Sequence, residues 1–190
     1  MRILTLTSSY PLAPDDGRGS FVRDLSLALM QQGFDVRVAA PRPADREIPD
    51  DPSGPDVGWL PTLISADTRV FHGSGIEANL RAHPSLAFRM PRFLASFSLE
   101  ALMAAWQSDV IVAHWLLPMG LVGALVSRVT GRPLIVVDHS GPAALSQMPP
   151  LRSVLRFVVA SASVVACVSN DVRTRTAKRV GTRLAHRLTT

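Results

Sequence analysis

The stretch DVIVAHWLLPMGLVGALVSRVTGRPLIVVDH, residues 109–139, decides the fold. Two runs rich in Val and Ile, 109–114 and 132–139, have the composition of buried β-strands. The apolar run between them, 120–130, has the length of a helix. A strand, a helix and a second strand in succession predict a parallel βαβ unit.

The same alternation extends toward both ends of the chain. Further strands are expected at 2–7, 35–40 and 163–169, and further helices at 21–34, 151–162 and 170–188. Ser20 is the expected N-cap of the first of these helices and Gly33 its end, with one apolar side made of Phe21, Val22, Leu25, Ala28 and Leu29. Residues 41–58 are expected to form a surface loop, and 59–108 a less regular mixture of short strands and helices. The pattern predicts an α/β fold with a doubly wound, Rossmann-like parallel sheet and a ligand site at the carboxyl ends of its strands.

Length and composition limit the class of protein. The chain has 190 residues, of which 47% are hydrophobic, and this favours a single domain over residues 1–190. No secretory signal peptide follows Arg2, and no apolar run approaches the roughly 20 residues that cross a bilayer. The single cysteine, Cys167, lies in an apolar run and is expected in the core. We therefore expect a cytoplasmic protein.

Polar residues follow the expected strands and gather on one edge of the sheet. They are the loop 8–20, His114, the run Asp138, His139, Ser140 and Gly141, and the pair Ser169 and Asn170. A histidine in such a place can hydrogen-bond a hydroxyl-rich ligand or a neighbouring part of its own chain, and both readings stay open. No metal is expected, because His72, His83 and His186 show no ligand spacing.

The loop SSYPLAPDDGRGSF, residues 8–21, brings two glycines to the start of a helix. Such a backbone can face a phosphate or a sugar, with Arg18 adding positive charge, and it can equally be an ordinary loop before a helix. It is not a dinucleotide fingerprint, because the third glycine is missing and the strand at 35–40 leads into Pro41 rather than an acid. No Walker A sequence is present either.

Three segments together strongly resemble the N-terminal domain of family 4 glycosyltransferases of the GT-B fold: 8–41, 109–141 and 160–173. The resemblance implies retaining transfer of a sugar from a nucleotide-sugar donor to an acceptor hydroxyl, without a metal or other cofactor. His139 matches a histidine that hydrogen-bonds the transferred sugar or the acceptor near the reacting carbon, and His114 matches one on the acceptor side. The other binding residues that the resemblance implies are Gly17, Arg18, Gly19, Ser20, Ser140, Gly141 and Ser169.

Two departures from the family pattern shape the expected function. Arg18 separates Gly17 and Gly19 where the family has a glycine pair. The family's second domain, which holds the donor nucleotide, has no counterpart before Thr190, so we expect the domain alone to be inactive and to need a donor-binding domain or subunit in trans, as in the two-subunit N-acetylglucosaminyl transferases. Carbohydrate or cell-envelope biosynthesis is the expected setting. The alternative is a non-catalytic module that binds a glycolipid, a sugar phosphate or a protein.

The C-terminal fifth of the chain is strongly basic. The net charge is +5, and residues 152–190 contain eight Lys or Arg against the single Asp171. In the expected helix 170–188, a stripe of Val172, Val180, Leu184 and Leu188 suits attachment to an anionic membrane surface, and it also suits packing on the protein's own sheet, which is the commoner case. Nucleic acid is not an expected partner, because no aromatic residues are interleaved with these cations.

Overall fold

Seven parallel strands form one sheet in the computed structural model, which describes residues 1–190 except 14–15, 44–53, 62, 65, 73–74 and 140–148. The strands are β1 (Arg2–Leu6), β2 (Asp35–Pro41), β3 (Asp56–Leu60), β4 (Val110–His114), β5 (Leu134–Asp138), β6 (Val164–Cys167) and β7 (Leu188–Thr189). The helices are α1 (Ser20–Gln31), α2 (Ile76–Ala82), α3 (Met90–Trp106), α4 (Leu121–Thr130), α5 (Pro149–Ser161) and α6 (Asn170–Val180). The predicted Rossmann-like α/β fold is confirmed.

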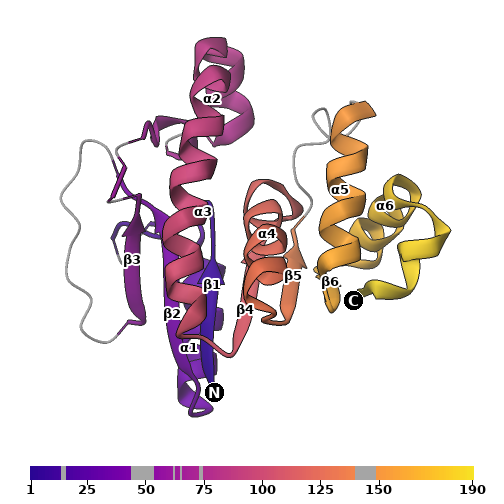
Figure 1. The fold of residues 1–190 in the computed structure, drawn as a ribbon, viewed down its shortest axis with the longest axis horizontal. Coiled ribbons are helices and arrows are strands. Elements are labelled where there is room, and N and C mark those ends of the chain that lie inside the picture. The colour runs from indigo at the N-terminus through magenta and orange to yellow at the C-terminus, as the bar shows by residue number, and fades with distance from the viewer. Residues whose placement is uncertain (14–15, 44–53, 62, 65, 73–74, 140–148) are drawn as a thin grey trace.

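Helices cover the two faces of the sheet unequally, and Figure 1 shows α3, α4 and α5 on the near side. Alternate residues of β1 point to opposite faces. Leu4 and Leu6 pack with side chains of α3, α4 and α5 in the larger buried cluster. Ile3 packs on the other face with Val22 of α1. Because both faces of the central strands are buried, their sequences are apolar almost without interruption.

The centre of the sheet is a topological switch point. The strand order is β3-β2-β1-β4-β5-β6-β7, so the chain moves outward in one direction from β1 and in the other from β4. These two strands are neighbours, with Leu6 in register with Ala113. A crevice forms outside the carboxyl ends of the strands at such a point, and ligands of open α/β sheets bind there. The segments after β1 and β4 are therefore the first place to look for a site.

The N-terminal cap of α1 differs from its prediction. Gly19, with φ of 71°, occupies the N-cap position, and Ser20 is the first residue inside the helix. The predicted apolar side is also wrong in part, because Phe21 and Leu25 are 40% and 39% exposed. The buried positions are Val22 and Ser26, one turn apart. The serine was overlooked because its hydroxyl donates to the carbonyl oxygen of Val22, which lets a polar residue enter the core.

The predicted final helix, 170–188, is wrong beyond Val180. Gly181, with φ of 90°, ends α6, a 3₁₀ turn follows over Thr182–Arg187, and Leu188 enters β7 beside β6. Val172, Val180 and Leu188 are all buried, so the apolar stripe packs on the protein's own sheet. The membrane-facing amphipathic helix is therefore absent from this segment, which the structure describes in full. None of the described helices has the length and apolar composition to cross a membrane.

Candidate functional site

Two histidines meet at the carboxyl ends of neighbouring strands. His114 is the last residue of β4, and His139 directly follows β5. Nδ1 of His114 lies 2.9 Å from Nε2 of His139, and the two rings are stacked with centroids 5.2 Å apart and planes at 16°. His114 is only 1% exposed, and its Nε2 has no hydrogen-bond partner among the described residues. The two histidines that the sequence singled out thus form one hydrogen-bonded pair.

Burial keeps this pair uncharged at neutral pH. Burial, and after it the nearby His139 as a like charge, lower the pKa of His114 to about 3. Burial also lowers the pKa of His139, although the Asp138 carboxylate opposes that change. A hydrogen bond between two ring nitrogens needs one donor and one acceptor, so both rings cannot be fully protonated at once. The pair is suited to hydrogen-bond a ligand rather than to act as a cation.

Asp138 anchors the strand end beside His139. Its side chain is completely buried and accepts a 2.7 Å hydrogen bond from the hydroxyl of Thr176 on α6. The carbonyl oxygen of Asp138 accepts from the backbone N–H of Val168, just beyond β6. A carboxylate held in this way fixes the backbone from which His139 projects, because both its side chain and its carbonyl are tied to neighbouring elements.

Two aromatic rings complete a cluster around His139. The centroid of Phe21, in the first turn of α1, lies 4.4 Å from that of His139 and 5.6 Å from that of Trp115. Trp115 follows β4 directly, and its centroid lies 5.2 Å from that of His139. We call Phe21, His114, Trp115 and His139 the aromatic cluster. Phe21 brings the start of the helix after the glycine loop to the two histidines. Neither Phe21, which was predicted only for the apolar side of its helix, nor Trp115 was predicted as a site residue; their only signal was an aromatic residue two positions after a loop glycine or directly after a strand-end histidine.

The chain turns sharply after His114. Trp115 has φ of 68° and ψ of 143°, a conformation that bulky residues rarely adopt. Its N–H donates to the carbonyl oxygen of Val137, and its own carbonyl accepts from the N–H of Gly120. A Cβ at Gly120 would lie 2.9 Å from that same carbonyl oxygen, so the turn requires glycine there. Backbone strain of this kind persists only where surrounding contacts enforce it, and it is frequent at functional sites.

The two glycines of the loop have different roles. A Cβ at Gly19 would lie 2.4 Å from the carbonyl oxygen of Ser9, so the backbone that approaches this glycine is the protein's own. Its positive φ excludes other residues for a second reason. Gly17 is exposed, and a Cβ there would meet no described atom within 4 Å. Of the two, Gly17 is therefore the one whose backbone is open to a ligand.

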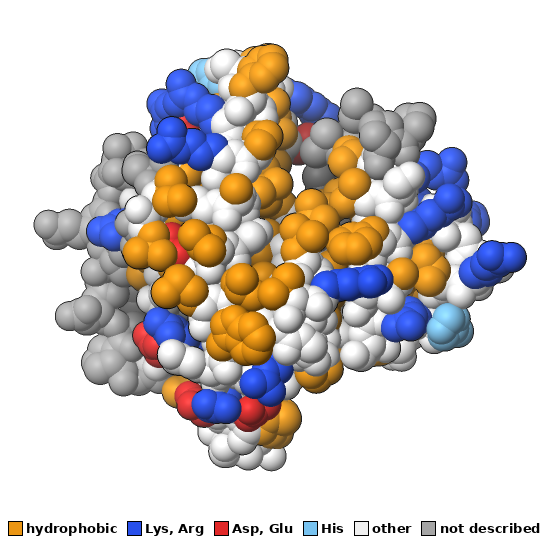
Figure 2. All heavy atoms as spheres, in the orientation of Figure 1, with side chains coloured by type: hydrophobic (Ala, Val, Ile, Leu, Met, Phe, Trp, Pro, Cys, Tyr) orange, Lys and Arg blue, Asp and Glu red, His pale blue; other side chains and the backbone are white. Residues whose placement is uncertain are grey.

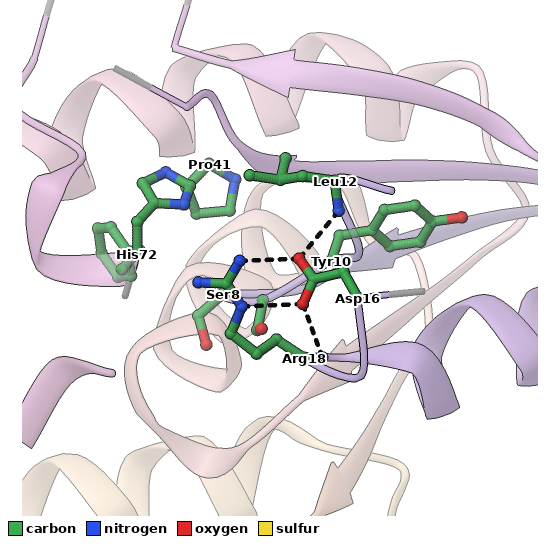
Figure 3. A pocket seen from close by; sticks show the side chains of 9 residues that line it. Ser8, Tyr10, Leu12, Asp16, Arg18, Pro41 and His72 are labelled. Atoms are coloured by element: carbon green, nitrogen blue, oxygen red, sulfur yellow. Dashed lines mark hydrogen bonds and ion pairs between the residues drawn. The ribbon is translucent and has the colours of Figure 1, made fainter. Parts of the chain in front are cut away.

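Arg18 is held by an acid of the same loop. Figure 3 shows its guanidinium facing the Asp16 carboxylate, with Nε and one terminal nitrogen each 2.9 Å from a carboxylate oxygen. The side-chain hydrogen bond from Arg18 lowers the pKa of Asp16 well below its usual range, and the pKa of Arg18 is raised in turn. Because the two charges cancel, Arg18 contributes less to binding an anion than its sequence suggests.

A small open pocket lies beside this ion pair, at the ends of β1 and β2 (Figure 3). Ser8, Pro41 and His72 line it together with Asp16 and Arg18. Nε2 of His72 lies 3.1 Å from the carbonyl oxygen of Arg42. The sequence had assigned no role to His72, since nothing in its spacing connects it with residues sixty positions earlier.

The other predicted site residues are less closely tied to the aromatic cluster. Ser20 is half-buried in the first turn of α1. Ser169 caps α6, where its hydroxyl accepts from the N–H of Val172 at 3.2 Å. Ser140 and Gly141 lie outside the described residues. Within the described part of the chain, no three His, Cys, Asp or Glu residues are grouped closely enough to hold a metal ion.

This geometry defines a Rossmann-like α/β domain with a candidate site at the switch point of the sheet. Residues 16–187 match the family Glycosyltransferase Family 4, and the chain belongs to this family. It has the Rossmann-like fold of the N-terminal domain of these enzymes. The family resemblance seen in the sequence is thereby confirmed.

Solved structures share this fold at low sequence identity. HepE from Anabaena, in complex with UDP and glucose, is 18% identical with a TM-score of 0.58, over 100% of this chain and 43% of that one. Sucrose-phosphate synthase from Thermosynechococcus elongatus is 18% identical with a TM-score of 0.62, over 94% of this chain and 45% of that one. A UDP-GlcNAc 2-epimerase from Methanocaldococcus jannaschii is 12% identical with a TM-score of 0.56, over 100% of this chain and 45% of that one.

These similarities show the fold alone, since they include an enzyme that is not a glycosyltransferase. The chain spans less than half the length of each of these structures. No curated protein matches the sequence.

Proposed function

We propose that this domain supplies the acceptor side of a retaining glycosyl transfer from a nucleotide sugar to an acceptor hydroxyl. The observation that carries the proposal is the hydrogen-bonded pair of His114 and His139 at the switch point of a family 4 domain. Nε2 of His139 is engaged by His114, so Nδ1 is the ring nitrogen left for a ligand, and it donates to or accepts from a hydroxyl group according to the tautomer. Such a group orients an acceptor without adding charge to the site.

In this proposal the two histidines have unequal parts. His139 is half-buried and is the member of the pair that a ligand can reach. His114 is buried and acts through the hydrogen bond between its Nδ1 and Nε2 of His139. Correct orientation of the reacting hydroxyl is worth several kcal/mol of the barrier.

The loop before α1 is the proposed second contact, to the donor diphosphate or to the acceptor. Gly17 offers an exposed backbone there, and α1 has no acidic side chain in its first turn. The N-terminal end of a helix favours an anion through its backbone N–H groups. Because Arg18 is already paired with Asp16, the proposed contact depends on the backbone more than on the guanidinium.

The rest of the proposed enzyme is a donor-binding domain or subunit that supplies the charge needed at the leaving diphosphate. The molecular surface also has an apolar area away from this site, on the outer face of two helices that run back to the amino ends of β4 and β5. Figure 2 shows apolar side chains gathered over α3 and α4, and the exposed ones include Leu99, Met103 and Trp106 on α3 and Leu125 and Val129 on α4. A contiguous exposed apolar surface is typical of an interaction site.

The proposal keeps a cytoplasmic location and allows contact with an anionic membrane. The apolar side of α6 packs on the protein's own sheet, so any such contact depends on the charge of the exposed cations. Some of them are engaged within the protein, for example Arg175 with Asp171 and Arg173 with the carbonyl oxygen of Leu188. Flotation with anionic and neutral vesicles tests the contact directly.

An NMR titration of the isotope-labelled 190-residue chain tests the acceptor role. A panel of methyl glycosides is expected to shift the signals of the His139 and Trp115 side chains in the unchanged protein, and to leave the Trp115 signal of His139→Ala in place. UDP-glucose alone is expected to release no UDP. A panel without any effect on His139 would refute the acceptor role. Sugar transfer by the isolated chain would refute the need for a partner.

A further inference from the structure

Phe21 occupies a place that the packing of the protein does not require. Its helix, α1, is held to the sheet through Val22, which is fully buried. Phe21 belongs to neither of the buried clusters formed by the described residues. It is 40% exposed, as is its neighbour Leu25 one turn later at 39%, and yet its ring contacts His139. Phe21 therefore contributes its ring to the aromatic cluster and not to the core.

The contacts of Phe21 are concentrated on the aromatic cluster. Its centroid is 4.4 Å from that of His139, 5.6 Å from that of Trp115 and 6.2 Å from that of His114. The planes of Phe21 and His139 are tilted by 41°. His139 therefore has rings against it from three segments: His114 at the end of β4, Trp115 just beyond it, and Phe21 at the start of α1. Phe21 contacts the His139 ring on one side and faces water on the other. It therefore lies between part of the imidazole and the solvent.

We propose that Phe21 is a positioning residue for His139: it shields the imidazole from water on the α1 side and keeps its hydrogen-bonding edge directed at the sugar hydroxyl. The part that concerns the sugar rests on the proposed function. The shielding itself is a property of the domain and can be measured without any ligand. Rings packed at 4 to 6 Å restrict the rotation of an imidazole and lower its contact with water.

The expected consequence is electrostatic. Burial is the main reason that the pKa of His139 lies below its usual value. The other groups acting on the pair are His114, a potential like charge on β4, and the Asp138 carboxylate, which opposes the effect from β5. On the α1 side, Arg18 is paired with Asp16, and Arg23 and Asp24 follow Phe21 along the helix. Removing the Phe21 ring admits water and leaves all these charged groups in place, so the pKa of His139 should rise toward its usual value.

The test is an NMR titration of the histidine ring signals in the full chain, with His139 assigned by its loss in His139→Asn. Phe21→Ser is expected to raise the His139 midpoint by roughly half a pH unit or more. Phe21→Leu retains an apolar side chain and is expected to give a smaller rise. Leu25→Ser is the matched control, because Leu25 has the same exposure on the same face of α1 and lies one turn farther from the start of the helix than Phe21.

Equal midpoints in the unchanged protein, Phe21→Ser and Phe21→Leu would overturn the proposal. A rise of the same size in Leu25→Ser would also overturn it, because the change would then belong to the helix and not to the ring. Backbone NMR spectra establish that each variant is folded. If Phe21→Ser unfolds, the His139 midpoints of Phe21→Leu and Leu25→Ser still test the proposal, because only Phe21→Leu is expected to raise the midpoint. The titration needs no sugar, so its outcome is independent of the methyl glycoside experiment.

Discussion

Replacing His114 by Asn should make the stability of the protein less sensitive to acid. Asn places an amide near the position of Nδ1, the atom with which His114 contacts His139, and it does not titrate. The pKa of His114 is about 3 in the folded protein, against 6.5 for an ordinary histidine. Between these values the unfolded chain binds a proton that the folded protein does not. Stability from His114 is therefore complete above pH 6.5 and is lost as the pH falls toward 3.

The size of the effect follows from the difference between the two pKa values. Below the unfolded pKa of 6.5, each pH unit lowers the free energy of unfolding by about 1.4 kcal/mol for this histidine. Between pH 6.5 and pH 5 the loss is therefore about 2 kcal/mol. Asp16 and Asp67 also have lowered pKa values, but their contributions are lost only as the pH falls through the normal carboxylate range near 3.8 and below. The window from pH 7 to 5 thus isolates the histidines.

The assay is urea unfolding at pH 7 and pH 5 at constant ionic strength. Across this interval the free energy of unfolding of the unchanged protein should fall by about 2 kcal/mol more than that of His114→Asn. His83→Asn is the control, because His83 is exposed and lies outside the aromatic cluster. It should follow the unchanged protein. Equal losses in the unchanged protein and His114→Asn would refute the reasoning, since the buried imidazole would then not be the group that resists protonation.

Three further outcomes are expected. Gly19→Ala should destabilise the protein by at least about 1 kcal/mol in urea unfolding, because the new Cβ meets the Ser9 backbone at positive φ, whereas Gly17→Ala should change little; equal effects would contradict the distinction between the glycines. Thr176→Val should cost about 1 to 3 kcal/mol by leaving buried Asp138 without its hydroxyl donor, and Thr176→Ser should retain most of the stability. Cys167 is buried and its pKa is raised to about 11, so a thiol reagent at pH 8 should react only after unfolding, and rapid labelling of the folded protein would count against its core position.

The order of strands and helices could be predicted from local sequence pattern. The errors at the start of α1 and at the end of α6 show what that pattern cannot predict. Apolar runs of Val and Ile predicted β1, β2, β4, β5 and β6 to within two residues at each end, because a strand buried on both faces has a nearly continuous apolar sequence. The end of α6 was missed because Val180, Leu184 and Leu188 keep a helical spacing across Gly181. Leu188 instead pairs with Val165 as part of β7, a contact with a strand that lies more than twenty residues earlier in the sequence. Local periodicity contains no information about such a partner.

The sequence by itself determined the fold class, the family and the two histidines, because each depends on residue types at fixed places after apolar strands. Only the tertiary structure decided how these residues work. It paired His114 with His139, placed Phe21 against them and cancelled the charge of Arg18 with Asp16. It also turned Gly19 toward the protein's own backbone. The physical reason is that a hydrogen bond or a ring contact depends on distances of a few ångströms between segments far apart in the chain, and these distances exist only once the sheet has brought the strand ends together.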